Sequence, residues 1–92
     1  MKEFYPNYIE WEKLGYVFED GYYQDDEVSY WLNKDQTTIR FKYQANNKTW
    51  KQEKLTYNFD GEEKEVPFTE KELILLEKEK ERVKKYFEDI TN

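Results

Sequence analysis

The chain has 92 residues and a mass of 11.5 kDa, which is enough for one domain, and its net charge at pH 7 is −6. It contains no Cys and no His, which excludes disulfides, thiol nucleophiles, Cys/His zinc sites and catalytic triads that use His. Its three Trp, nine Tyr and six Phe predict a thin, aromatic core. No apolar run reaches the roughly 20 residues of a transmembrane helix, so we expect a cytoplasmic protein without a membrane anchor.

A short helix is predicted near the N-terminus, between Asn7 and Gly15. Asn7 is a typical N-cap, Glu10 stands at the acidic position of a capping box, and Gly15 stands where a glycine ends a helix. Tyr8 and Trp11 lie on one side of this helix, which is therefore expected to pack against the rest of the domain.

The segment after this helix is expected to form a hairpin. Residues 16–18 are a short run with high β-propensity, and Glu19-Asp20-Gly21 has the composition of a turn in which glycine supplies a positive φ. Tyr22 and Tyr23 are then expected to belong to the return strand.

Two further strands are predicted in the next part of the chain. Residues 28–32 form an apolar run that ends in a polar turn over residues 33–36. Residues 37–44 alternate apolar and polar side chains, which is typical of an antiparallel strand with one buried face. The polar residues that share one face of this strand are Thr38, Arg40, Lys42 and Gln44.

The partner of that strand is predicted at residues 49–59, after an Asn-rich turn. Leu55, Tyr57 and Phe59 share one face of it. Trp50 has the opposite parity, so either it points to the other face or a β-bulge lies between it and Leu55.

A last hairpin is predicted around Asp60-Gly61, which is the strongest turn signal in the chain. The polar segment 63–68 that follows is expected to be an edge strand, where Pro67 is tolerated.

The most strongly predicted element is a helix from Glu70 to about Asp89. Thr69 and Glu72 have the spacing of a capping box, and Phe68 with Leu73 has the spacing of a hydrophobic staple. Its apolar stripe is expected to cover the sheet and consists of Leu73, Ile74, Leu75, Leu76, Val83, Tyr86, Phe87 and Ile90. A coiled-coil homodimer through this helix is the alternative, so the protein is expected to be a monomer or such a dimer.

The chain is thus predicted to be a single α+β domain over residues 1–92. It would contain a short N-terminal helix, an antiparallel β-meander of four or five strands, and a long C-terminal helix packed on the sheet.

Charge is unevenly distributed along the chain, with balances of −6 over residues 1–33, +4 over 34–59 and −4 over 60–92. The net negative charge of such a chain repels phosphate. Acidic side chains beside aromatic rings can, however, bind in a partner's groove that normally holds phosphates and bases. We therefore expect a protein partner. The candidate contact residues, acidic or aromatic, are Glu19, Asp20, Tyr22, Tyr23, Asp25, Asp26, Glu27 and Trp31.

Binding of single-stranded nucleic acid is the alternative function. It would use a basic sheet face, on which charges follow the nucleic-acid backbone and an exposed ring stacks on bases. The candidate residues for this alternative are Arg40, Lys42, Trp50, Lys51 and Lys54.

Catalysis is not expected from this sequence. The acid clusters at 25–27 and 62–65 lack the spacing of an EF-hand loop, and the glycines stand alone rather than in a phosphate-binding loop. We expect no enzyme activity, no cofactor and no metal site.

The order of motifs resembles a known group of proteins. These motifs are Trp11-Glu12-Lys13-Leu14-Gly15-Tyr16, a Tyr-rich meander with Ile39-Arg40-Phe41, and a Thr-capped helix rich in Glu and Lys. The chain resembles small accessory proteins encoded by phages and mobile elements of low-GC Gram-positive bacteria, some of which inhibit host defence nucleases, including CRISPR effectors. The resemblance implies a non-enzymatic inhibitor of a host protein that acts on nucleic acid, working in the host cytoplasm.

Overall fold

The computed structural model describes residues 7–24 and 26–91, apart from the side chains of Tyr8, Tyr22, Tyr23, Ile90 and Thr91. Its elements are α1 (Tyr8–Lys13), β1 (Val17–Gln24), β2 (Glu27–Lys34), β3 (Thr37–Gln44), β4 (Thr49–Tyr57), β5 (Glu63–Glu65) and α2 (Glu70–Thr91). The strands form one five-stranded antiparallel sheet in the order β1-β2-β3-β4-β5. The predicted α+β class, with its meander and long C-terminal helix, is confirmed.

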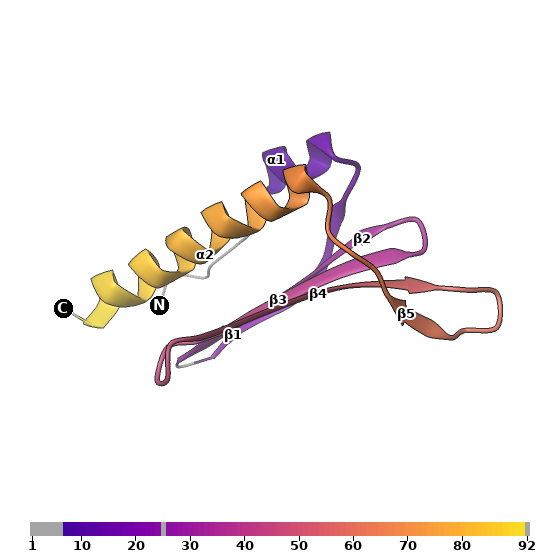
Figure 1. The fold of residues 1–92 in the computed structure, drawn as a ribbon. Coiled ribbons are helices and arrows are strands. Elements are labelled where there is room, and N and C mark those ends of the chain that lie inside the picture. The colour runs from indigo at the N-terminus through magenta and orange to yellow at the C-terminus, as the bar shows by residue number, and fades with distance from the viewer. Residues whose placement is uncertain (1–6, 25, 92) are drawn as a thin grey trace.

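The fold has two layers, because α2 lies across one face of the sheet and α1 lies beside the N-terminal end of α2 (Figure 1). Alternate residues of the central strands point toward α2 and are buried. The core they form with the helices consists of Trp11, Tyr16, Val28, Tyr30, Leu32, Ile39, Phe41, Tyr43, Leu75, Leu76, Val83 and Phe87. Within the described residues, neither helix is long and apolar enough to cross a membrane.

The N-terminal helix differs from its prediction at the cap. Asn7 is the N-cap, but its side chain makes no capping hydrogen bond. The capping box predicted with Glu10 is wrong, because the Asn7 backbone N–H donates to Oε1 of Glu79 in α2 at 2.9 Å. Glu10 instead pairs with Lys13, one turn along the helix. Gly15 ends the helix as predicted, with a φ of 92°.

The predicted turn at residues 19–21 is wrong, as is the return strand after it, because β1 continues through both. A register shift against β2 leaves Glu19 as a β-bulge. Gly21 serves packing here rather than a turn. It lies opposite Tyr30, and a Cβ at position 21 would be 2.3 Å from Cδ1 of that ring.

The bounds of the later strands differ from the prediction. β2 extends to Lys34, so the turn before β3 shrinks to two residues, and Asp35 takes a φ of 53°. β4 ends at Tyr57 and β5 covers only three residues, so both strands are shorter than predicted. Phe59, expected on a strand face, lies in the turn between them and is 100% exposed.

The start of α2 agrees with the sequence because its capping box forms. The backbone N–H of Glu72 donates to Oγ1 of Thr69 at 3.2 Å, and the Thr69 N–H donates to Oε1 of Glu72 at 2.9 Å. The predicted apolar stripe is only partly correct. Leu73 and Ile74 are 43% and 51% exposed, while the carboxylates of Glu72 and Glu79 are buried on the side that faces the sheet.

Candidate functional site

The pairing of β3 with β4 decides which residues face α2. The register between these strands is continuous from Thr37–Thr56 to Gln44–Thr49, without a bulge. Trp50 lies directly opposite Tyr43, and directly opposed residues of an antiparallel pair share one face. Trp50 therefore faces α2, and Leu55 faces away from it. Of the two predicted alternatives for Trp50, the opposite face is correct and the bulge is not.

The surroundings of Trp50 are those of a core residue. Its ring stacks on Phe41 at a centroid distance of 5.3 Å, and its Nε1–H donates to Oε1 of Gln52 at 2.7 Å. Lys54 lies on the same side of β4, where its Nζ is 2.8 Å from Oε1 of Glu72. The grouping of Trp50 and Lys54 with Arg40, Lys42 and Lys51 on one basic face is thus wrong.

The opposite side of the sheet is not covered by any helix in the described part of the chain (Figure 1). We call it the uncovered face. Its residues, by strand register, include Asp20, Glu27, Ser29, Trp31, Asn33, Thr38, Arg40, Lys42, Gln44, Thr49, Lys51, Glu53, Leu55 and Glu65.

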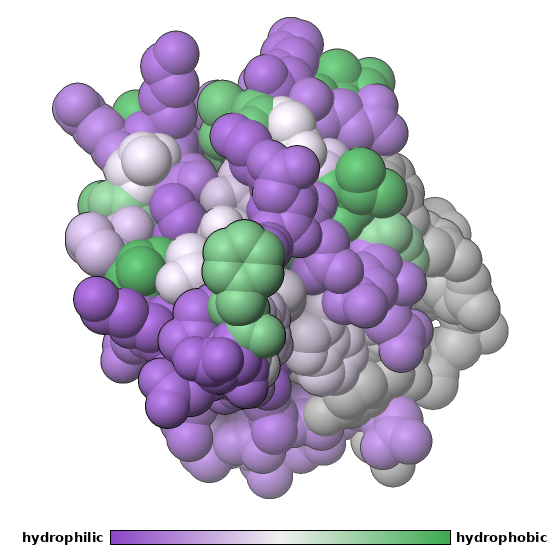
Figure 2. All heavy atoms as spheres, turned by 90° about the vertical axis from the view of Figure 1, so that its right-hand side faces the viewer, coloured by the Kyte–Doolittle hydropathy of each residue, from purple (hydrophilic) through white to green (hydrophobic). Residues whose placement is uncertain are grey.

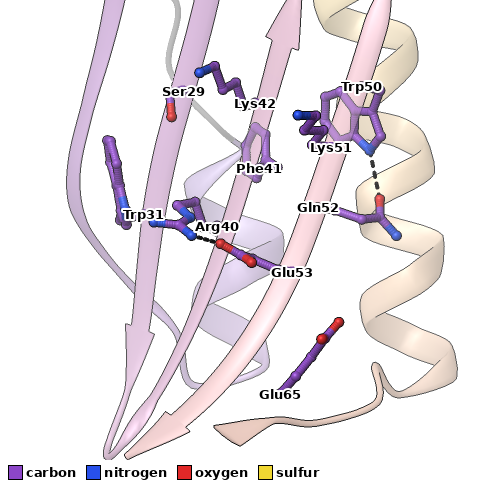
Figure 3. A pocket seen from close by; sticks show the side chains of 10 residues that line it. All are labelled: Ser29, Trp31, Arg40, Phe41, Lys42, Trp50, Lys51, Gln52, Glu53 and Glu65. Atoms are coloured by element: carbon purple, nitrogen blue, oxygen red, sulfur yellow. Dashed lines mark hydrogen bonds and ion pairs between the residues drawn. The ribbon is translucent and has the colours of Figure 1, made fainter. Parts of the chain in front are cut away.

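A hollow of about 720 Å³ lies over the middle of this face. Trp31 of β2, Arg40 of β3 and Lys51 of β4 line it from neighbouring strands, as Figure 3 shows. The complete lining is Ser29, Trp31, Arg40, Phe41, Lys42, Trp50, Lys51, Gln52, Glu53 and Glu65. A Trp and an Arg side by side in a hollow are the residue types that most often anchor protein interfaces.

Most cations of the uncovered face are already neutralised. Arg40 forms an ion pair with Glu53 on the next strand, and Lys42 Nζ lies 2.8 Å from Oε1 of Glu27. Lys51, in contrast, is exposed and makes no ion pair within the residues described here. The face as a whole carries more carboxylates than cations, so it is not a basic surface.

The acidic and aromatic candidates from the sequence are distributed over several places. Asp20 and Trp31 lie directly opposite each other on the uncovered face, and Glu27 lies on the same face. Glu19 is exposed in the bulge of β1, and Asp26 is half-buried in the turn before β2. Asp25 and the side chains of Tyr22 and Tyr23 lie outside the described residues.

Two carboxylates are buried beneath α2, away from this face. Glu72 accepts hydrogen bonds from the Tyr16 hydroxyl at 2.5 Å and from Lys54 Nζ at 2.8 Å. Burial alone would raise the pKa of Glu72, but the hydrogen bonds from Lys54, Tyr16 and the Thr69 backbone outweigh it and lower this pKa. Burial, together with the hydrogen bond to Glu72, raises the pKa of Tyr16.

For Glu79, burial has a larger effect on the pKa than the hydrogen bonds have. Glu79 accepts two hydrogen bonds from Arg82, at 2.8 and 2.9 Å, and one from the Asn7 backbone. Burial nevertheless dominates and raises the pKa of Glu79. The partners of Glu72 and Glu79 are Asn7 before α1, Tyr16 before β1, Lys54 of β4, Thr69 before α2 and Arg82 of α2 itself. The two carboxylates therefore fix the position of α2 and belong to the fold rather than to the uncovered face.

The exposed apolar side chains do not form a second site. Those that are large and exposed are Ile9, Val17, Phe59, Leu73 and Ile74. Figure 2 shows hydrophilic residues over most of the end that it views, with apolar residues scattered among them. Scattered apolar residues of this kind are normal on a protein surface.

Sequence reasoning separated two groups of residues that the structure brings together. It placed Trp31 with the acids and Arg40 with Trp50, whereas Trp31 and Arg40 are directly opposed on the uncovered face. The available signal was the placement of the apolar residues Val28, Tyr30 and Leu32 at alternate positions, which gives Trp31 the opposite parity. Comparisons with protein-family models, curated proteins and solved structures found no match to this chain.

Proposed function

We propose that this protein is a non-enzymatic binding protein that docks on a protein partner through its uncovered face. The observation that carries the proposal is the position of Trp31, half-buried in the central hollow and directly opposite Arg40. Trp and Arg are enriched among the residues that contribute most to binding energy, and such residues cluster near the centre of an interface.

The charge pattern favours a protein over nucleic acid. A nucleic-acid strand presents a continuous row of phosphates, and its affinity comes from cations that are free to replace counterions. Arg40 and Lys42 are paired with Glu53 and Glu27, and the face also carries Asp20 and Glu65. A partner surface with charges of both signs complements this arrangement better than a polyanion does.

The proposed partner class is a host protein that acts on nucleic acid, which the protein would inhibit. This part of the proposal is supported by the resemblance to accessory proteins of phages and mobile elements, and by the net charge of −6. An acidic protein is attracted to the basic surface that nucleic-acid enzymes present.

A second candidate is binding of single-stranded nucleic acid. One observation favours it: the hollow combines the ring of Trp31 with the cations Arg40, Lys42 and Lys51. In this candidate function Trp31, rather than Trp50, would stack on bases.

Site-specific photo-crosslinking tests the proposal. A photoreactive residue at Thr38, on the uncovered face, should cross-link one protein from a Gram-positive host lysate, and the same residue at Lys78 on exposed α2 should not. The identified protein, once purified, should bind the wild type and lose about 30-fold in affinity for Trp31→Ala, as for an interface anchor worth about 2 kcal/mol.

Two results would contradict this proposal. Unchanged affinity for Trp31→Ala would show that the uncovered face is not the binding surface. Short single-stranded oligonucleotides should not bind the protein at low salt. If they bind, and the Trp31→Ala variant and added salt both weaken this binding, the function belongs to the second candidate.

A further inference from the structure

The uncovered face contains an unfavourable pair that folding does not require. Lys42 and Lys51 are directly opposed across β3 and β4. Like charges in directly opposed positions destabilise a sheet. The charge of Lys42 is balanced by Glu27, whose Oε1 lies 2.8 Å from Lys42 Nζ. No acid within the described residues forms an ion pair with Lys51.

The two lysines line the central hollow. Its lining also includes Trp31 and Ser29, which lies directly opposite Lys42 and is only 2% exposed. Figure 3 shows Lys42 and Lys51 rising from adjacent strands on the same part of the sheet. A negative group placed between the two side chains would form an ion pair with Lys51, and it would share Lys42 with Glu27.

We propose that the partner supplies one carboxylate side chain to the space between Lys42 and Lys51, beside the ring of Trp31. This inference rests on the proposed function and names the chemistry of its partner. The bound segment carries a single central Asp or Glu flanked by basic residues, because two acids lie beside the lysines on the same face. Glu27 contacts Lys42, and Glu53 is two residues from Lys51 on β4.

These acids also distinguish a carboxylate on a protein from a nucleic-acid strand. A single carboxylate meets only the lysines, and basic residues on either side of it meet the acids of the face. A nucleic-acid strand would place its next phosphates against those acids, which are unfavourable partners for them.

The test uses peptides selected from a displayed random dodecapeptide library on the full-length protein. Peptides whose binding is lost in Trp31→Ala define binders of the uncovered face. These peptides should contain an Asp or Glu. Their affinity for the Lys51→Glu variant should be at least about 10-fold lower than for the wild type, as expected for a close charge pair. Lys78→Glu, an equal change of charge on exposed α2, should change affinity less than 2-fold.

A charge exchange makes the test sharper. Replacing the acidic residue of a selected peptide by Lys should restore its binding to the Lys51→Glu variant. The melting temperature of Lys51→Glu should equal or exceed that of the wild type, because the substitution removes a like-charge pair. The loss of binding then has no origin in unfolding.

The possible outcomes separate the two proposals. Peptides that depend on Trp31 but not on Lys51 would overturn the carboxylate site and leave the docking face in place. If no selected peptide depends on Trp31, the docking face and the carboxylate site both fail. If a short oligonucleotide displaces the peptides in a manner that depends on Lys51, the site binds phosphate instead, and the inference is overturned.

Discussion

Neutralising Lys54 should destabilise the fold, whereas neutralising Lys51 on the same strand should leave its stability almost unchanged. Lys54 and Lys51 are three residues apart, so they point to opposite faces of the sheet. The side chain of Lys54 is 13% exposed and pairs with Glu72, whose side chain is 6% exposed. Lys51 is exposed and has no such acid within the described residues. The variants Lys54→Met and Lys51→Met replace the lysine by an unbranched side chain of similar length that has no ammonium group.

The structure sets the expected size of each effect. Removing one partner of a buried ion pair costs about 3–5 kcal/mol, because the remaining charge stays buried. We expect about 3 kcal/mol for Lys54→Met, at the lower end, since Glu72 keeps the hydrogen bonds from Tyr16 and Thr69. For Lys51→Met we expect a change within about 0.5 kcal/mol, as for other exposed positions.

Urea unfolding at pH 7, followed by far-ultraviolet circular dichroism, measures both free energies. A loss of about 3 kcal/mol would also lower the melting temperature by about 12 °C or more for a domain of this size. Equal losses in the two variants would refute the assignment of the two faces. The uncovered face would then not exist as described, and the proposals built on it would fail with it.

Two further predictions concern packing and pH. Gly21→Ala should destabilise the fold by about 1–3 kcal/mol in the same urea assay, because the new Cβ meets Tyr30, while Gly61→Ala should cost about 1 kcal/mol, from its φ of 79° alone. The free energy of unfolding of the wild type, relative to that of Glu72→Gln, should be constant at neutral pH. It should decrease as the pH falls below 4.5, because the folded pKa of Glu72 is lowered. The free energy of unfolding of the wild type, relative to that of Glu79→Gln, should instead increase as the pH falls from 7 toward 4.5, because the folded pKa of Glu79 is raised. A common pH dependence in the two Gln variants would contradict the opposite environments of these carboxylates.

The elements that could be predicted from the sequence are those fixed by local signals. The Thr69–Glu72 capping box places the start of α2, and the strict alternation over residues 37–44 identifies β3 and its buried face. Both depend on residues within a few positions of one another, so no knowledge of the tertiary structure is needed.

The face of β4 could not be predicted in the same way. This strand has an apolar residue at each parity, Trp50 on one side and Leu55 on the other, so alternation alone does not choose between them. The choice depends on long-range contacts, namely the stacking of Trp50 on Phe41 and the ion pair of Lys54 with Glu72. The candidate site was divided incorrectly for this reason.

Gly21 was misread, and Glu79 was not identified as a buried residue, because their roles also depend on other elements of the fold. A glycine after two acids is typical of a turn, but here it makes room for Tyr30 of the neighbouring strand. A Glu in a charged helix normally faces water, whereas Glu79 is 1% exposed and accepts a hydrogen bond from Asn7. Neither partner is close in sequence.

The architecture explains why one face of the sheet is available for binding. A helix of 22 residues is about 33 Å long, and one such helix covers only one face of a five-stranded sheet about 24 Å wide. On the covered face, Trp50 stacks in the aromatic core and contributes to folding. Trp31 lies on the other face, half-buried among charged side chains. Its position in the central hollow, directly opposite Arg40, is where we propose that the partner docks.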